Sequence, residues 1–264
     1  MTEQATSHAA ATHAAAAESS ANELPSFFDF LGINKHSEFL GIGYHDWIPI
    51  VMSLLVAVVL ILVTLWCTRK MEKVPRGPQA FIELVVEALT NFFTGIIGPA
   101  APRYIPLLGS LFLYIILMNL WGLIPLMHSP TSKLNTTLAL ALVVFVATQY
   151  EGMRVKGVWG YLKHFMEPLM LAPLMLPIHL IGELARPVSL SLRLFGNLTG
   201  EDIAIASLVF LTPFILGFIP IPFHVVMMLL ALLFSTVQAV VFTLLASIYI
   251  GSAIGALEGG EHEH

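Results

Sequence analysis

Long apolar runs, separated by short polar or charged stretches, dominate the pattern along this chain. A helix needs about 20 apolar residues to cross the roughly 30 Å hydrocarbon core of a bilayer. Several runs meet or approach that length, and the last two exceed it. The pattern predicts five membrane-spanning helices over residues 47–67, 104–127, 134–150, 168–215 and 222–255.

The C-terminal part of the chain is too long and too apolar for one crossing. Residues 203 to 257 carry no charged side chain apart from the titratable His224. The stretch GFIPIPFH, residues 217–224, interrupts this run, because each proline removes a backbone donor and fixes φ. We therefore expect one long helix from about 168 to 215, bent or interrupted near residue 200. A second long helix from about 222 to 255 would complete a hairpin of unusual length.

Residues 78–98 have a different pattern, with apolar positions at helical spacing and Glu83, Glu87 and Asn91 on the opposite side. Such one-sided periodicity predicts an amphipathic helix that lies in the membrane interface rather than crossing it. A soluble-type helix packed against a partner subunit has the same pattern, so both interpretations stay open.

Composition assigns the chain to a class. Of its 264 residues, 57% are hydrophobic and only 11% are charged, whereas soluble domains average about a quarter charged. These values, with a mean hydropathy of +0.83, predict an all-α integral membrane protein. The single cysteine, Cys67, excludes an internal disulfide and a cysteine-rich metal site. We expect no metal, no cofactor, no nucleic-acid partner and, without a GxxxxGK[ST] phosphate loop, no nucleotide site.

The ends of the chain and the loop charges predict its orientation. Residues 1–40 are expected to be a largely disordered or surface tail, 41–258 one membrane domain, and 259–264 a short polar tail. Basic residues cluster at 69–76 and at 154–163, after the first and third predicted spans. The positive-inside rule then places the N-terminus outside and the C-terminus in the cytoplasm. The absence of a transit peptide favours a bacterial inner membrane.

A stripe of polar and charged side chains runs along the fourth predicted helix. A polar stripe on an apolar helix must face protein, water or another polar surface, because lipid cannot solvate it. Glu183 and Arg186 are at i, i+3 and can pair with each other. The stripe, at steps of three or four residues, consists of His179, Glu183, Arg186, Leu190, Arg193, Asn197 and Glu201.

Arg193 has no residue of opposite charge at i±3 or i±4. Arginine stays protonated in proteins, so it cannot avoid the cost of burial by becoming neutral. Glu201 lies about 80° away around an ideal helix and Asp202 about 180° away. We therefore expect the counter-charge of Arg193 to come from another part of the assembly. Glu201 and Asp202 are candidate proton carriers, and the alternative is that they mark a solvated helix end.

The stretch RPVSLSLRLFGN, residues 186–197, resembles the signature of subunit a of F-type ATP synthases. Its proline, serine–leucine pair, arginine and asparagine correspond to Pro187, Ser189, Leu190, Arg193 and Asn197. MNLWGLIP, PTSKLNTTLALAL and TVQAVVFTLLASIYI also resemble that family, with Gln238 at a polar position in the last of these. The resemblance covers roughly residues 40–255.

The resemblance implies a stationary proton-translocating subunit that has no catalytic nucleotide site of its own. Its C-terminal hairpin would pack against a rotating ring of c subunits, and its other partners would include the peripheral-stalk subunit b. Two offset half-channels would lead protons to the ring carboxylates. Arg193 would force each ring acid to ionise and prevent a direct proton leak. Ion flow would thereby be coupled to rotary ATP synthesis.

The resemblance also implies roles for the polar residues around Arg193. Asp202, or its neighbour Glu201, would relay protons on the external side, with Asn197 and Gln238 as polar neighbours. His179 would belong to the internal path, and Glu183 is a further candidate for the proton path, on a side that the sequence leaves open. Some relatives have a titratable residue at the position of Ala231 in this chain, so His224 or the Glu201–Asp202 pair is needed to compensate.

Two other function classes are compatible with a membrane protein of this composition. One is a secondary transporter or channel that acts alone, with Arg193 binding an anionic substrate. The other is a purely structural membrane anchor. We see no internal repeat of the kind that transporters often have. Neither class explains the ordered family blocks or an arginine without a local partner.

Overall fold

The computed structural model describes residues 44–69, 77–124, 129–157, 159–161, 172–216 and 223–255. Within these ranges every regular element is a helix, which confirms the all-α prediction. The predicted tails at 1–40 and 259–264 and most of the proline-rich break lie outside the described residues. The elements are α3 (Tyr44–Thr68), α4 (Pro78–Ile97), the short helical turn η1 (Gly98–Arg103), α5 (Ile105–Trp121), the turn η2 (Pro130–Ser132), α6 (Leu134–Lys156), α8 (Ala172–Leu216) and α9 (Phe223–Ile254).

Four described segments are long and apolar enough to cross a membrane, which makes this a multi-pass membrane protein. The count differs from the five predicted spans, because α5 is a shorter apolar helix and α8 is not among the four. The segment Gln79–Arg103, expected to lie in the interface, is one of them, since its high mean hydropathy outweighs Glu83 and Glu87. The others are Ile48–Thr68, Leu134–Lys156 and Met228–Ile254.

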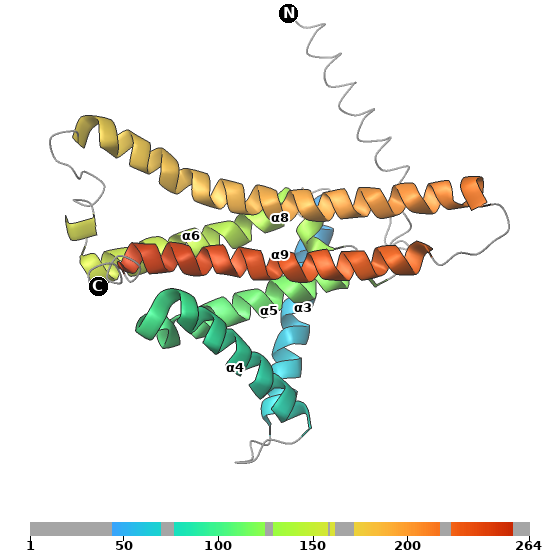
Figure 1. Cartoon of the computed structure of the whole chain (residues 1–264), viewed down its shortest axis with the longest axis horizontal. Helices are drawn as coiled ribbons and strands as arrows, with labels where there is room; N and C mark the ends of the chain where they lie inside the picture. The colour runs from blue at the N-terminus through green and yellow to red at the C-terminus, as the bar shows by residue number, and fades with distance from the viewer. Residues whose placement is uncertain are drawn as a thin grey trace, which may run out of the picture.

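Helices α8 and α9 run side by side in opposite directions and form the long hairpin (Figure 1). Helix α8 has 45 residues, so at 1.5 Å per residue it is about 68 Å long. That is more than twice the thickness of the hydrocarbon, so α8 fits a bilayer only with a strong tilt. The expected interruption near residue 200 is absent from α8. The helix instead curves in its N-terminal half, where Pro177 and Pro187 each remove a backbone hydrogen bond (Figure 1).

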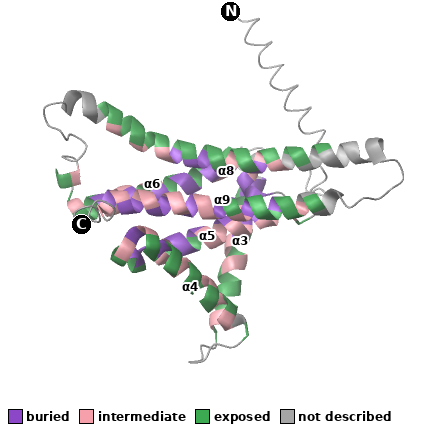
Figure 2. Cartoon of the chain, viewed as in Figure 1, coloured by how far each residue is buried: buried purple, intermediate pink, exposed green. Residues whose placement is uncertain are grey.

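The buried core lies where α5, α6, α8 and α9 meet (Figure 2). Leu108 and Ile115 from α5 are fully buried there, beside Phe242 from α9 and Leu194 from α8. Helix α9 contributes mainly small side chains to this core, which let helix backbones approach closely in a membrane protein. These small buried residues include Ala239, Thr243, Ala246, Ser247 and Ala253.

A chain of buried hydrogen bonds holds η2 against α5 and joins α5 to α9. The Thr131 hydroxyl donates to Asn119 Oδ1 at 2.9 Å and lies 2.7 Å from the Ser129 hydroxyl. Asn119 Nδ2 in turn donates to the backbone carbonyl of Ser235 at 3.3 Å. Because a buried polar group is costly when it is left unpaired, these bonds determine where the chain between α5 and α6 can lie.

Gly122 provides a stability test of this anchor. A Cβ at Gly122 would lie only 2.7 Å from Ser129 Cβ, whereas a Cβ at Gly95 on α4 would meet no atom within 4 Å. We expect Gly122→Ala to displace the η2 segment and to destabilise the protein by about 1–3 kcal/mol. Gly95→Ala should be neutral or slightly stabilising. Thermal unfolding of the purified complexes measures both, and equal midpoints would contradict this account of the anchor.

Candidate ion-translocation site

Arg193 lies on the exposed side of α8, near the middle of the helix. The opposite side of this helix is buried: Leu190 is 1% exposed and Leu194 is fully buried. Within the described part of the chain, Arg193 makes no hydrogen bond and no ion pair. Arg103, Arg154 and Arg186, by contrast, each lie within 4 Å of a carboxylate oxygen. The prediction that Arg193 finds no partner on its own helix is thus confirmed for the described residues.

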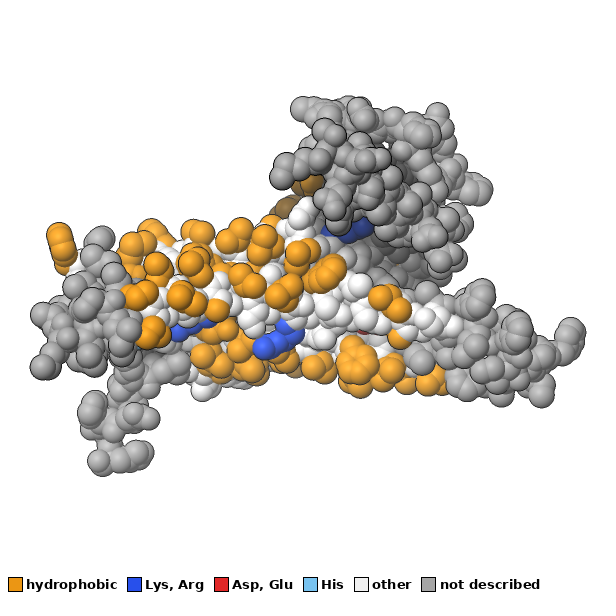
Figure 3. Space-filling model, turned by 90° about the horizontal axis from the view of Figure 1, so that it is seen from above, with side chains coloured by type: hydrophobic (Ala, Val, Ile, Leu, Met, Phe, Trp, Pro, Cys, Tyr) orange, Lys and Arg blue, Asp and Glu red, His pale blue; other side chains and the backbone are white. Residues whose placement is uncertain are grey.

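The surface around α8 is predominantly apolar. Seen from above, the molecule shows a broad apolar face in which basic side chains appear as separate small patches (Figure 3). An isolated cation in such surroundings has little solvation from the protein. The geometry therefore favours a partner of opposite charge that approaches from outside this chain.

A polar contact joins α8 to α9 one helical turn beyond Arg193. The amide nitrogen of Asn197 donates to the amide oxygen of Gln238, which is 41 residues away in the sequence. Gln238 is only 3% exposed, and its own amide nitrogen has no partner among the described residues. The hydroxyls of Thr199 and Ser235 are also buried without a partner there. Buried donors of this kind usually hold water or another polar group.

The two acids beyond Asn197 are described to different extents. Glu201 is half-buried on α8, whereas the side chains of Asp202 and His224 lie outside the described part of the structure. The backbones of both these residues are helical, in α8 and α9. Their assignment to the external path remains a prediction from the sequence.

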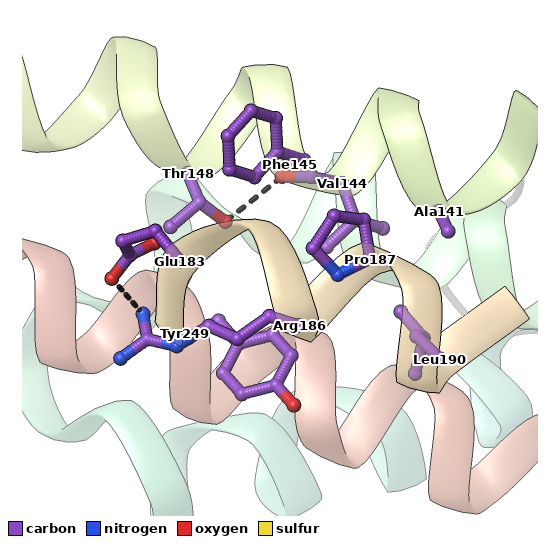
Figure 4. Close-up of a pocket in the computed structure, with 9 residues that line it drawn as sticks. All are labelled: Ala141, Val144, Phe145, Thr148, Glu183, Arg186, Pro187, Leu190 and Tyr249. Atoms are coloured by element: carbon purple, nitrogen blue, oxygen red, sulfur yellow. Dashed lines mark hydrogen bonds and ion pairs between the residues drawn. The ribbon is translucent and has the colours of Figure 1, made fainter. Parts of the chain in front are cut away.

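The predicted pairing of Glu183 with Arg186 is confirmed (Figure 4). Arg186 Nη1 lies 2.5 Å from Glu183 Oε1, and the two side chains are 34% and 14% exposed. The Arg186 guanidinium also lies over the ring of Tyr249 on α9, 5.1 Å from the ring centroid, which is a cation–π distance. His179, one turn before Glu183, is half-buried. Arg186 is therefore satisfied within the chain, unlike Arg193.

Two residues beside the Glu183–Arg186 pair, Gln149 and Tyr161, were not predicted from the sequence. Gln149 Nε2 on α6 donates to Glu183 Oε2 at 3.1 Å, and the Tyr161 hydroxyl donates to Gln149 Oε1 at 2.7 Å. For Gln149 the sequence offers one signal, a neutral amide near the end of a predicted span, 134–150, that contains no charged side chain. An uncharged residue such as Gln149 is missed when only the charged side chains of a predicted span are considered.

Among the described residues there is no group of three or more His, Cys, Asp or Glu side chains that could hold a metal ion.

Comparison with known proteins decides the family. Residues 50–251, most of the chain, match the family model described as ATP synthase A chain. The chain belongs to this family.

Curated members of the ATP synthase A chain family are similar over nearly their whole length. A protein from Protochlamydia amoebophila named ATP synthase subunit a is 38% identical over 246 residues, which cover 87% of this chain and 89% of the relative. One of the same name from Trichlorobacter lovleyi is 43% identical and covers 86% and 96%. ATP synthase subunit a 1 from Syntrophotalea carbinolica is 44% identical and covers 83% and 88%.

The family match includes every part of the site described above. Arg193, Asn197 and Gln238 lie inside the matched range, as do Gln149 and Glu183. The resemblance that the signature RPVSLSLRLFGN indicated is therefore confirmed at the level of the family. As expected from the sequence, the A chain family is a family of membrane subunits.

Proposed function

We propose that this chain is the proton-translocating stator subunit of an F-type ATP synthase in a bacterial inner membrane. Its partners would be the c-ring, the peripheral-stalk subunit b and the remainder of the synthase. Two offset aqueous half-channels would lead protons to and from the ring carboxylates, and nucleotide chemistry would take place on other subunits. The N-terminus would face outward and the C-terminus the cytoplasm.

The observation that carries this proposal is the exposed side chain of Arg193, which has no partner among the described residues. A charge inside a membrane is costly unless it is paired, and arginine cannot lose its proton. A moving carboxylate on a neighbouring subunit would supply the missing partner. Its protonated form is neutral and can face lipid, and a fixed cation nearby favours its ionisation. Arg193 would thereby release each proton on arrival and keep the two half-channels electrically separate.

The Asn197–Gln238 contact supports a polar surface beside Arg193. The Gln238 amide nitrogen has no described partner, so it is available to a water molecule or to an approaching carboxyl group. In the proposal, Glu201 and Asp202 serve the external half-channel and His179 and Glu183 the internal one. His224 is the further candidate on α9. Each proton that crosses the field releases about 2.3 kcal/mol per 100 mV, which would drive rotation.

The test of the proposed function is ATP-driven proton uptake into membrane vesicles that carry the assembled synthase. Native complexes are compared with complexes that contain Arg193→Ala, after assembly has been verified by the subunit composition of the purified complex. Loss of uptake in the assembled variant supports the proposal. Normal uptake would reject it, and Arg193 would then be an arginine whose charge the pump does not need.

Neutralising the acids one at a time identifies the external relay. We expect either Glu201→Gln or Asp202→Asn to reduce uptake by about a hundredfold or more, as for loss of a positioned proton-transfer group. The other substitution should leave uptake within about twofold, because one carboxyl is sufficient for a single proton path. Uptake rates of the two single variants and the double variant are measured in the same vesicles. A double variant that pumps at the native rate would remove both acids from the path.

A further inference from the structure

The carboxylate of Glu183 is held from two sides by two different helices. Its Oε1 pairs with Arg186 on α8, and its Oε2 accepts a hydrogen bond from Gln149 Nε2 on α6. Arg186 is itself placed by the Tyr249 ring on α9. The two oxygens thus have different partners, so the plane of the carboxylate is fixed relative to α6, α8 and α9.

Tyr161 determines which end of the Gln149 amide faces Glu183. The Tyr161 hydroxyl donates to Gln149 Oε1, so the nitrogen end of the amide is directed at the carboxylate. Burial and, after it, the negative charge of Glu183 raise the pKa of the Tyr161 hydroxyl above its usual value. Tyr161 therefore remains a hydrogen-bond donor throughout the physiological pH range.

The local backbone explains how Tyr161 reaches Gln149. Gly157 ends α6 with φ of 73° and ψ of 157°, a conformation that is essentially restricted to glycine. The Tyr161 amide donates to the Gly157 carbonyl at 2.9 Å. The Tyr161 ring then lies directly on Gly152, where an added Cβ would be only 2.6 Å from the ring. Two glycines thus provide the turn and the space for this tyrosine.

A small pocket adjoins the Glu183–Arg186 pair between α6, α8 and α9 (Figure 4). Val144, Phe145 and Pro187 make its walls largely apolar, while Glu183 and Arg186 form its charged end. In a pocket with few other polar groups, the orientation of one carboxylate decides where a proton or a water molecule can bind.

We propose that Gln149, oriented by Tyr161, is a positioning residue for the internal half-channel. It holds the Glu183 carboxylate in the orientation in which it accepts protons and passes them toward the ring. This inference rests on the proposed function, because it needs Glu183 to lie on the proton path. The groups around Glu183 in the described structure include Arg186 and, one turn earlier, the titratable His179 on α8. Tyr249 on α9, Tyr161 after α6, and the neutral Gln149 and Thr148 on α6 also lie near it.

The experiment measures ATP-driven proton uptake by the complete synthase in vesicles over a range of pH. Uptake by the Gln149→Leu complex is divided by uptake of the native complex at each pH. The pH dependence of ATP hydrolysis on the other subunits is the same in both complexes and cancels in this ratio. A lost hydrogen bond to a carboxylate makes its ionised form less favourable. We expect the ratio of variant to native uptake to fall at lower pH, with the midpoint of the profile raised by about 0.5 to 1 pH unit.

Two further variants separate positioning from ordinary packing. Tyr161→Phe removes only the hydroxyl and should shift the pH profile in the same direction by a smaller amount. If the Gln149→Leu complex does not assemble, the proposal is tested with Tyr161→Phe alone. The matched control is Tyr150→Phe, whose side chain is 58% exposed and should leave the profile unchanged.

A uniform loss of uptake without a shift of the profile would overturn the proposal, because a residue that only holds helices together scales the rate at every pH. A native profile in both Gln149→Leu and Tyr161→Phe would also overturn it. Arg193→Ala in the same vesicles distinguishes the two levels of inference. If Arg193→Ala abolishes uptake while the Gln149 profile is native, only the positioning role is wrong. If Arg193→Ala pumps normally, the proposed function is wrong.

Discussion

Replacing Arg193 with alanine is expected to reduce ATP-driven proton uptake by at least about a hundredfold in an assembled synthase. A unit charge 4 Å from a carboxylate contributes about 4 kcal/mol at an effective dielectric constant of 20. Since each 1.4 kcal/mol is a factor of ten, loss of this attraction makes ionisation of a ring carboxyl beside α8 nearly a thousandfold less favourable. The expected loss of uptake is smaller than this effect on ionisation, because water can partly stabilise the ionised ring carboxyl in place of Arg193.

Arg193→Lys tests whether charge alone is sufficient. Lysine retains one positive charge, but it is a compact ammonium without the planar donor fork of arginine, and its pKa falls when it is desolvated. We expect uptake to remain at least tenfold below native. Arg154→Ala is the matched control, because Arg154 is 52% exposed and shares Glu151 with Arg103 at 3.7–3.8 Å. Glu151 keeps Arg103 as a partner in this variant, and Arg154 itself is half-exposed to solvent, so the control should pump normally.

The measurement is the initial rate of vesicle acidification per amount of assembled complex. An Arg193→Ala complex that acidifies vesicles within twofold of the native rate would refute the role assigned to this arginine. If Arg154→Ala were impaired as strongly as Arg193→Ala, the loss would reflect removal of any arginine rather than a specific role.

Gln238→Leu is expected to reduce ATP-driven proton uptake by about two- to tenfold. The substitution leaves the Asn197 amide without its acceptor and removes the Gln238 amide nitrogen, which has no partner among the described residues. Asn197 is exposed, so the cost is that of one lost hydrogen bond, about 0.5–1.5 kcal/mol, which corresponds to that range. Gln238→Glu retains the acceptor oxygen for Asn197 and should lose less activity than Gln238→Leu.

The control for Gln238→Leu lies two residues earlier on the same helix. Thr236 is half-buried and its hydroxyl donates to the carbonyl of Leu232 within α9, so Thr236→Val should leave proton uptake close to native. Uptake and assembly are measured as for Arg193. Native uptake in Gln238→Leu would show that the α8–α9 amide contact plays no part in ion movement.

Features that depend on spacing along one helix could be predicted from the sequence. The i, i+3 spacing of Glu183 and Arg186 predicts their ion pair, which the structure contains. The absence of an acid at i±3 or i±4 from Arg193 indicates an arginine without a partner on its own helix. The all-α membrane class follows from the apolar runs and the scarcity of charge. These predictions hold because helical geometry is the same in every α-helix, so sequence separation alone determines which side chains are neighbours.

Other features depend on how the helices pack. Asn197 meets Gln238 across 41 residues and Gln149 meets Glu183 across 34, and periodicity does not indicate which face of one helix contacts another. A bend or interruption near residue 200 was predicted, but α8 continues through it as one helix that packs against α6 and α9. The length and hydropathy of α4 likewise make it a candidate span despite its amphipathic pattern. Contacts between helices depend on the rotation, tilt and separation of each pair, which the packing of the whole core determines.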